Sequence, residues 1–270
     1  MPDHTAGSYQ FDKFDQQSSE FVILQRQAAA ALALEHKIWQ EAGLKPDMQV
    51  LDMGCGSGII STHLAEYVRD GMVLGVDSSI ALLHEAERLK VEKKLKNLKF
   101  RHGNVYEPGL PSGSFDFIYC RLLFQHLHEP EKALAALAGL LKPDGTVCIV
   151  DIDDDWLLLY PEPAELKSFI SRSVEAQKAD GGDRHAGRRL PAYLSSAGLK
   201  DVKAAVKVIS SFELDLKRFM QLAFDFRIER LPEQDLKTAR HELADIYAVL
   251  EQPSAWGAMG IFVATGKRPD

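Results

Sequence analysis

The sequence has few cysteines and no long hydrophobic run. Its 270 residues contain only Cys55, Cys120 and Cys148, which lie far apart and form no C-x-x-C pair. This spacing predicts neither a disulfide framework nor a zinc knuckle, and it favours a reducing compartment. No apolar run reaches the roughly eighteen residues of a membrane span, and the first residues lack the pattern of a signal peptide. We therefore expect a cytoplasmic protein without a membrane partner.

An excess of positive charge is also absent. The formal net charge is −7, from 32 lysines and arginines against 39 aspartates and glutamates. Because surfaces that bind nucleic acid are usually basic, we do not expect a nucleic-acid partner. A lysine-rich stretch at 88–101 is a candidate basic patch, but a solvated helix face is the simpler interpretation. The length and the hydrophobic content of 46% fit one elaborated globular domain.

Short apolar runs typical of strands alternate with helical patterns along the chain. Strands are predicted at 49–53, 72–76, 98–102, 115–120, 146–151, 202–209 and 260–266. Helices are predicted at 19–42, 58–69, 79–94, 130–141, 164–178, 190–197, 214–230 and 232–250. Such alternation predicts an α/β fold, in which a parallel sheet carries helices on both faces.

Three alternating glycines follow the first predicted strand. Gly54, Gly56 and Gly58 lie between this strand and a helical pattern, an arrangement that lets a ligand approach the main chain closely. Asp77 ends the second strand about twenty residues later, where an acid that binds ribose is expected. The dinucleotide fingerprint needs a further glycine at the position of Ile59. A nicotinamide-dependent oxidoreductase is therefore the weaker of two interpretations.

The segment 50–58 resembles the first motif of the class I S-adenosylmethionine-dependent methyltransferases. Three later segments, 100–105, 115–121 and 140–146, resemble further motifs of this family in the same order. The family resemblance implies a doubly wound, seven-stranded, mostly parallel sheet of the Rossmann-like methyltransferase fold, whose last strand is antiparallel. The segment 187–199 is similar to a branch that methylates small molecules. S-Adenosylmethionine is the cofactor that this resemblance implies.

We interpret residues 1–270 as a single methyltransferase domain. An N-terminal helical cap (1–45) precedes the cofactor-binding core (46–211), and a helical lid (212–257) is inserted before the final strand (258–270). The lid carries Phe212, Phe219, Met220, Phe224, Phe226 and Ile228, and aromatic residues of the cap are Tyr9, Phe11 and Phe14. These side chains are predicted either to close over an apolar substrate or to pack on the core or a second subunit. Arg218, Arg227 and Arg230 are candidates for holding an acidic group of the substrate, but surface positions are the default expectation for them.

The resemblance also implies which residues hold the cofactor. Asp52 would orient its ammonium group, and Asp77 would accept both ribose hydroxyls because a carboxylate has two acceptor oxygens. A structural carboxylate and a helix cap are the respective alternatives for these two acids. The implied cofactor contacts, from the amino-acid end to the adenine and the sulfonium, are Asp52, Gly54, Cys55, Gly56, Gly58, Asp77, Ser78, Asn104, Val105, Cys120 and Arg121.

The first candidate for a general base is His126, and His128 is the second. A metal site is not expected. Asp151, Asp153, Asp154 and Asp155 follow the fifth strand, where we expect an exposed acidic turn. Arg121 at the end of the fourth strand would repel a cation there.

The resulting hypothesis is methyl transfer from S-adenosylmethionine to an oxygen, nitrogen or sulfur atom of a small-molecule metabolite. Because the methyl donor is already activated, the protein would act mainly through proximity and orientation. The alternatives are the oxidoreductase and a non-catalytic regulatory module that binds the cofactor. The sequence leaves the oligomeric state open, with a homodimer among the options.

Overall fold

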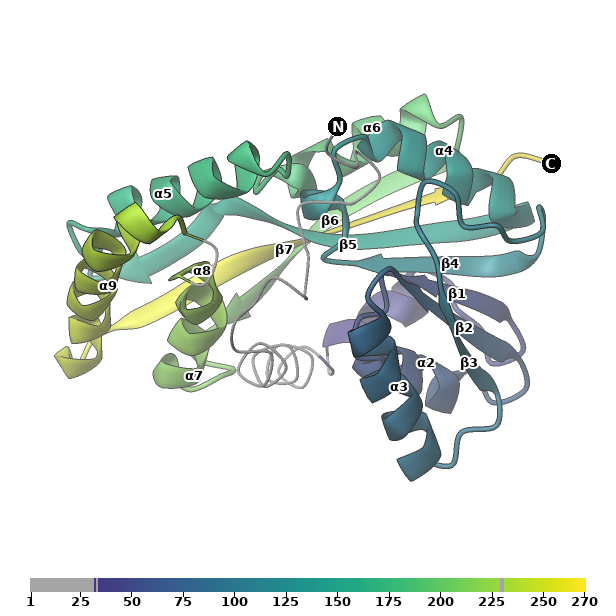
Figure 1. The fold of residues 1–270 in the computed structure, drawn as a ribbon, viewed down its shortest axis with the longest axis horizontal. Coiled ribbons are helices and arrows are strands. Elements are labelled where there is room, and N and C mark those ends of the chain that lie inside the picture. The colour runs from purple at the N-terminus through teal and green to yellow at the C-terminus, as the bar shows by residue number, and fades with distance from the viewer. Residues whose placement is uncertain (1–31, 33, 229–230) are drawn as a thin grey trace.

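A seven-stranded sheet organises the molecule (Figure 1). The structure is a computed structural model that describes residues 32, 34–228 and 231–270. The strands are β1 (Gln49–Met53), β2 (Met72–Asp77), β3 (Leu98–His102), β4 (Phe115–Arg121), β5 (Leu141–Tyr160), β6 (Lys200–Ser210) and β7 (Trp256–Lys267). Their order is β3-β2-β1-β4-β5-β7-β6. Because β7 pairs antiparallel with both of its neighbours while β1 to β5 pair in parallel, the predicted mostly parallel sheet is confirmed.

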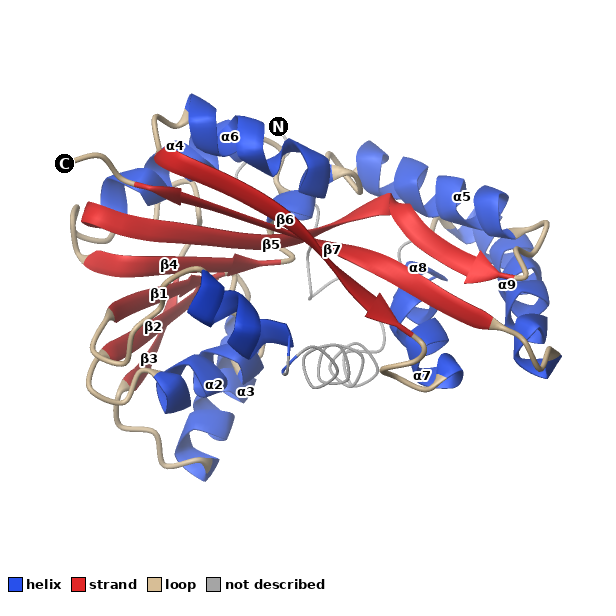
Figure 2. Ribbon diagram, turned by 180° about the vertical axis from the view of Figure 1, so that it is seen from behind, coloured by secondary structure: helices blue, strands red, loops and turns tan. Residues whose placement is uncertain are grey.

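Helices cover both faces of this sheet, as Figure 2 shows from behind. They are α2 (Ile59–Tyr67), α3 (Ile80–Glu92), α4 (Pro130–Leu140), α5 (Leu166–Ala179), α6 (Leu190–Ser196), α7 (Leu216–Met220), α8 (Phe226–Ile228) and α9 (Glu233–Tyr247). Apolar side chains of α4 and α6 pack on one face of β1, β4 and β5. Side chains of α2 and of the helical residues 34–41 pack on the other face. Within the described residues, no helix combines the length and the apolar character that a membrane span needs.

Strand β5 is much longer than the predicted strand 146–151. It begins at Leu141 before the expected turn, where Asp144 takes a left-handed φ of 60°. It pairs with β7 up to Ile152 and again from Leu157, with an irregularity between them. The acidic run lies in this region, and the expected exposed acidic turn is wrong because Asp151, Asp153 and Asp154 are buried. Sequence reasoning failed here because the balancing arginines come from distant segments.

The lid forms a third apolar cluster on the extended ends of β5 and β7 (Figures 1 and 2). The predicted helix 214–230 is divided within its described part into α7, a π-helical turn (Gln221–Asp225) and α8. Phe219, Met220 and Phe224 are fully buried against α5 and α9, whereas Phe212 is exposed. Phe219, Met220 and Phe224 therefore pack the lid onto α5, α9 and the extended strands, whereas Phe226 lines the cavity described below.

Much of the predicted N-terminal cap lies outside the described residues, including Tyr9, Phe11 and Phe14. The described part is helical at 34–41 and turns at Gly43, whose φ of 86° is left-handed. Glycine at this point ends the helix, as the sequence predicted. Ile38 and Trp39 are buried against α2 and the sheet. This packing holds the short helix, and the side chains on it, in place on the sheet.

Candidate functional site

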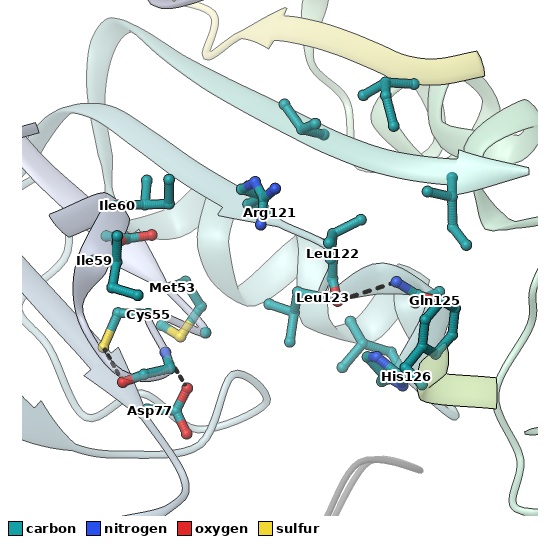
Figure 3. Close-up of a pocket in the computed structure, with 18 of the residues that line it drawn as sticks. Met53, Cys55, Ile59, Ile60, Asp77, Arg121, Leu122, Leu123, Gln125 and His126 are labelled. Carbon is teal, nitrogen blue, oxygen red and sulfur yellow. Dashed lines mark hydrogen bonds between the residues drawn. The ribbon is translucent and has the colours of Figure 1, made fainter. Parts of the chain in front are cut away.

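A cavity of about 370 Å³ opens at the carboxyl ends of β1, β2 and β4 and beside the middle of β5 (Figure 3). The strand order reverses between β1 and β4, where ligands of open α/β sheets usually bind. Its wall includes nearly all of the predicted cofactor contacts, namely Asp52, Gly54, Cys55, Gly56, Asp77, Ser78, Asn104, Val105 and Arg121. The structure thus brings these residues together, and their binding roles remain predictions.

The glycine loop is held by the end of β2. The amides of Gly54 and Cys55 donate to the carbonyl oxygen of Val76, at 2.8 and 3.1 Å. The amide of Gly56 donates to Asp77 Oδ2 at 2.8 Å. Gly54 and Gly56 have φ values of 75° and 53°, so glycine is needed for this turn. The loop is therefore fixed before any ligand arrives.

Gly58 lies outside the cavity wall, so its predicted contact with the cofactor stays a prediction. It precedes α2 with a φ of 76°. A Cβ atom at this position would lie 2.6 Å from Cβ of Ala86 and 2.7 Å from Cζ of Phe100. Gly58 is thus required for close packing of the loop on α3 and β3.

Asp77 connects the glycine loop with the start of α3. Besides Gly56, its carboxylate accepts a hydrogen bond from the amide of Ser79, which is 2.9 Å from Oδ1. The helix cap itself is Ser79, whose side chain accepts from the amide of Leu82. Burial raises the pKa of Asp77, while these backbone amides oppose the rise. Each carboxylate oxygen has more than one acceptor site, so the hydroxyls of a ligand can still bind there.

Asp52 is a buried acid at the end of β1, with an exposed fraction of 1%. Its Oδ2 accepts a hydrogen bond of 2.5 Å from Ser61 Oγ. Burial raises its pKa to about 7, a rise that the Ser61 hydrogen bond opposes and the nearby carboxylates Glu35 and Asp77 reinforce. Because a neighbouring positive charge favours the ionised form, this acid suits a cationic ligand group.

The end of β4 contributes Arg121, which ion-pairs with a residue that sequence reasoning missed. Arg121 Nε lies 2.6 Å from Glu35 Oε1, and the hydroxyl of Tyr119 donates to the same carboxylate. Glu35 is 2% exposed and lines the cavity from the helix at 34–41. No local signal distinguishes it from a surface glutamate of an amphipathic helix. Its pairing neutralises Arg121 beside the glycine loop.

Cys120 is absent from the cavity wall, and its predicted contact with the cofactor also stays a prediction. Side chains alternate between the two faces of a strand. Cys120 is fully buried in the core cluster beneath α4, while its neighbour Arg121 reaches the cavity. Burial raises the pKa of the Cys120 thiol far above its usual range, which fits a core residue.

The chain turns sharply where it leaves β4. Leu122 has a φ of 52°, which is unusual for a residue with a branched side chain, and its amide donates to Val150 at 2.7 Å. The turn brings Leu122, Leu123 and His126 to the cavity wall, as Figure 3 shows. His126 Nδ1 lies 3.5 Å from Gln177 Nε2. The second candidate base, His128, is not part of this wall.

The lid side of the cavity contains a buried network of charged groups. Arg184 and Arg227 are both 3% exposed, and both guanidiniums bind the carboxylate of Asp154. Burial opposes ionisation of Asp154, but the two arginines outweigh it and hold its pKa below the usual range. The expected surface position of Arg227 is therefore wrong. Arg218 is exposed, as expected, and Arg230 lies outside the described residues.

Among the described residues, Asp153, Asp155 and His185 form a group with the donor atoms of a metal site. Their potential ligand atoms all lie within 4.8 Å of one another. However, the guanidinium of Arg188 donates to both carboxylates. This guanidinium supplies the positive charge that a cation would otherwise bring.

Comparisons with known proteins agree with this geometry. Residues 51–149 match the family model described as a methyltransferase domain. An uncharacterized methyltransferase of Schizosaccharomyces pombe is 29% identical over 72% of this chain and 74% of its own length. Trans-aconitate 2-methyltransferase of Deinococcus radiodurans is 37% identical over 39% of this chain. The aligned segment covers 38% of that enzyme, so the chain spans well under half of its length.

The crystal structure of the YcgJ protein from Bacillus subtilis shares the fold. Its TM-score is 0.58 at 20% identity, and the match covers 88% of this chain and 98% of that one. The domain match includes the glycine loop, β2 and β4, which carry the cavity wall. Residues 51–149 thus carry a methyltransferase domain, and the predicted resemblance to the class I S-adenosylmethionine-dependent methyltransferases is confirmed.

Proposed function

We propose that this enzyme transfers the methyl group of S-adenosylmethionine to an oxygen, nitrogen or sulfur atom of a small-molecule metabolite. The observation that carries the proposal is the continuity of the cavity. Its wall runs from the glycine loop at Gly54 and Gly56 to the lid residues Leu222 and Phe226. A volume of about 370 Å³ falls within the range of about 300–1,000 Å³ that is usual for small-molecule sites.

The residues at the sheet edge fit S-adenosylmethionine. Asp52 is a buried acid with a raised pKa. The ammonium group of the ligand would lower this pKa and favour the ionised carboxylate. Asp77 holds the glycine loop and retains acceptor sites for the ribose hydroxyls. Ser78, Asn104 and Val105 line the adjoining wall, where we place the adenine. The cofactor supplies a methyl group on a positively charged sulfur, which is already activated for transfer.

The protein then has to orient the acceptor and exclude water. The apolar residues Leu122, Leu123 and Leu157 share the wall with His126. Holding a nucleophile in line with the methyl group can contribute about 7–11 kcal/mol to the lowering of the barrier. We place His126 as the base for an acceptor that is protonated at working pH, with Gln177 orienting its ring. Deprotonation is needed only for such acceptors.

The names of relatives support a small acceptor. Trans-aconitate 2-methyltransferase, which is 37% identical over 39% of this chain, is named for a small molecule. Family membership weighs against the nicotinamide-dependent oxidoreductase, whose fingerprint the loop lacks at Ile59. The non-catalytic regulatory module predicts the same cofactor binding without turnover, so only an assay of transfer separates it from the enzyme.

Incubation with tritiated S-adenosylmethionine and a cell extract tests the proposal. The extract is separated beforehand into small molecules, protein and nucleic acid. We expect label in the small-molecule fraction, and we expect the Asp77→Ala variant to lose it. Label confined to protein or nucleic acid would overturn the assignment of the acceptor. Tight binding of S-adenosylhomocysteine without any labelled product would support the regulatory module instead.

A further inference from the structure

The two ends of the cavity differ in charge. The acids Asp52 and Asp77 lie at the cofactor end, where Glu35 and Arg121 neutralise each other. The lid end instead contains two buried arginines with one buried aspartate between them. This difference indicates that the cavity receives a cationic group at one end and a group of opposite charge at the other.

The arginine pair is built from two distant segments. Arg184 lies between α5 and α6, and Arg227 lies in α8 of the lid. Arg184 binds Asp154 through Nε at 2.9 Å and Nη2 at 2.8 Å. Arg227 binds the same carboxylate through Nη1 at 2.7 Å and Nη2 at 2.9 Å. The ring of Phe226 lies 5.0 and 5.1 Å from the two guanidinium carbons and supports them.

A purely structural role, in which these ion pairs only hold the lid in place, does not account for the charge of this network. One guanidinium suffices to neutralise Asp154, so the second leaves the group with an excess positive charge. Removing such a charge from water is costly unless it is compensated. Arg227 is held further by the carbonyl of Ala223 and by Ser173, but these are neutral partners. An anionic ligand would supply the missing compensation.

Among the described residues, the other nearby acids are paired outside the network or have a raised pKa. Asp153 binds Arg188, a partner outside the network that it shares with the exposed Asp155. Asp151 is fully buried and is not part of the cavity wall. Burial raises the pKa of Asp151 to about 7, so below neutral pH this group is mainly protonated.

At the lid end, some guanidinium N–H groups make no hydrogen bond to the described part of the chain. A guanidinium has five N–H groups. The bonds of Arg184 to Asp154 and to Gln125 Oε1, the latter at 2.8 Å, use three of them. Arg184, Arg227 and Gln125 all lie on the cavity wall. Planar arginine donors are well matched to the oxygens of a carboxylate or a phosphate.

We propose that the lid end of the cavity is an anion subsite, where Arg184 and Arg227 bind a carboxylate or phosphate group of the methyl acceptor. Ile209, Leu222 and Met259 line the same end and would contact an apolar body. The identification of the bound molecule as the methyl acceptor rests on the proposed function. The anion subsite itself does not, because it can be measured by binding.

Calorimetry of the protein saturated with S-adenosylhomocysteine tests the subsite. The probes are matched pairs of an acid and a neutral analogue, namely benzoate with benzamide, octanoate with octanamide, and phenyl phosphate with phenol. The titrations are made at about pH 6.5, below the pKa of Asp151. We expect the acid of at least one pair to bind about tenfold more tightly than its neutral partner, and the three pairs separate carboxylate from phosphate.

Variants distinguish anion binding from a purely structural role of the arginines. Arg184→Lys keeps the charge but loses the planar fork, so the preference for acids should fall severalfold. Arg188→Lys is the matched control, because Arg188 is partly exposed and is absent from the cavity wall, and it should leave the preference unchanged. Asp154→Asn removes the competing carboxylate and should tighten the binding of acids. A purely structural role predicts only reduced stability of the folded protein.

Neutral analogues that bind as well as their acids, or no binding by any probe, would overturn the anion subsite. An unchanged preference in both Arg184→Lys and Arg227→Lys would do the same. The proposed function fails in a different way, because acids would bind while no small molecule in an extract becomes methylated.

Discussion

Replacement of Asp52 by asparagine should have opposite effects on stability and on ligand binding. Burial raises the pKa of Asp52 from 3.8 to about 7. At about 1.4 kcal/mol per pH unit, ionising this acid in the folded protein costs up to about 4 kcal/mol. Because the folded-state pKa is raised, the stability that the group contributes is fully present below pH 3.8. It is lost as the pH rises through about 7.

The Asp52→Asn variant should therefore be more stable than the wild type at about pH 8 without ligand, by up to about 4 kcal/mol. The amide oxygen can still accept the hydrogen bond of Ser61. Asp151 also has a pKa of about 7, but it is present in both proteins, so their difference isolates Asp52. Urea unfolding followed by circular dichroism at about pH 5 and pH 8 measures this difference.

Ligand binding should respond in the opposite direction. S-Adenosylhomocysteine carries an ammonium group that favours ionised Asp52. With a free pKa of about 7, wild-type affinity should be about tenfold weaker at pH 6 than at pH 8, and the variant should bind weakly at both. A variant that is less stable at pH 8 and binds the ligand as the wild type does would refute this account of Asp52.

Other substitutions test the remaining parts of the site. Asp77→Ala should weaken S-adenosylhomocysteine binding by about 2–4 kcal/mol in calorimetry, with a smaller loss for Asp77→Asn; equal affinities would contradict the ribose assignment. Gly58→Ala should lower the free energy of unfolding by about 2–4 kcal/mol, because its Cβ would lie 2.6 Å from a neighbour. Gly43→Ala, which has a φ of 86° but no atom within 4 Å, should cost only about 1–2 kcal/mol. Glu35→Gln should destabilise the protein by about 3 kcal/mol and weaken cofactor binding, because Arg121 loses its partner; unchanged unfolding would argue against this pair.

The cofactor half of the site was predictable because its signals are local. A strand, a glycine turn and a second strand ending in Asp77 lie within one short segment, and the sheet brings their ends together. Strand alternation also explains why the structure places Arg121 but not Cys120 on the cavity wall. The side chains of Arg121 and Cys120 project to opposite faces, and the sequence does not reveal which of them faces the cavity.

The lid half was not predictable because its contacts are long-range. The acidic run after β5 has the local pattern of an exposed turn, yet Arg184 and Arg227 bury and neutralise Asp154. These arginines lie 30 and 73 residues further along the chain. Glu35 was missed for the same reason, since its partner Arg121 lies 86 residues away.

The most direct test of the central claim is a crystal structure of the protein with S-adenosylhomocysteine. We predict that the ribose lies within hydrogen-bond distance of Asp77, that the amino-acid end contacts the loop at Gly54 and Gly56, and that the sulfur faces Leu122 and His126. Density for the ligand at another place, or a ribose without contact to Asp77, would contradict the account.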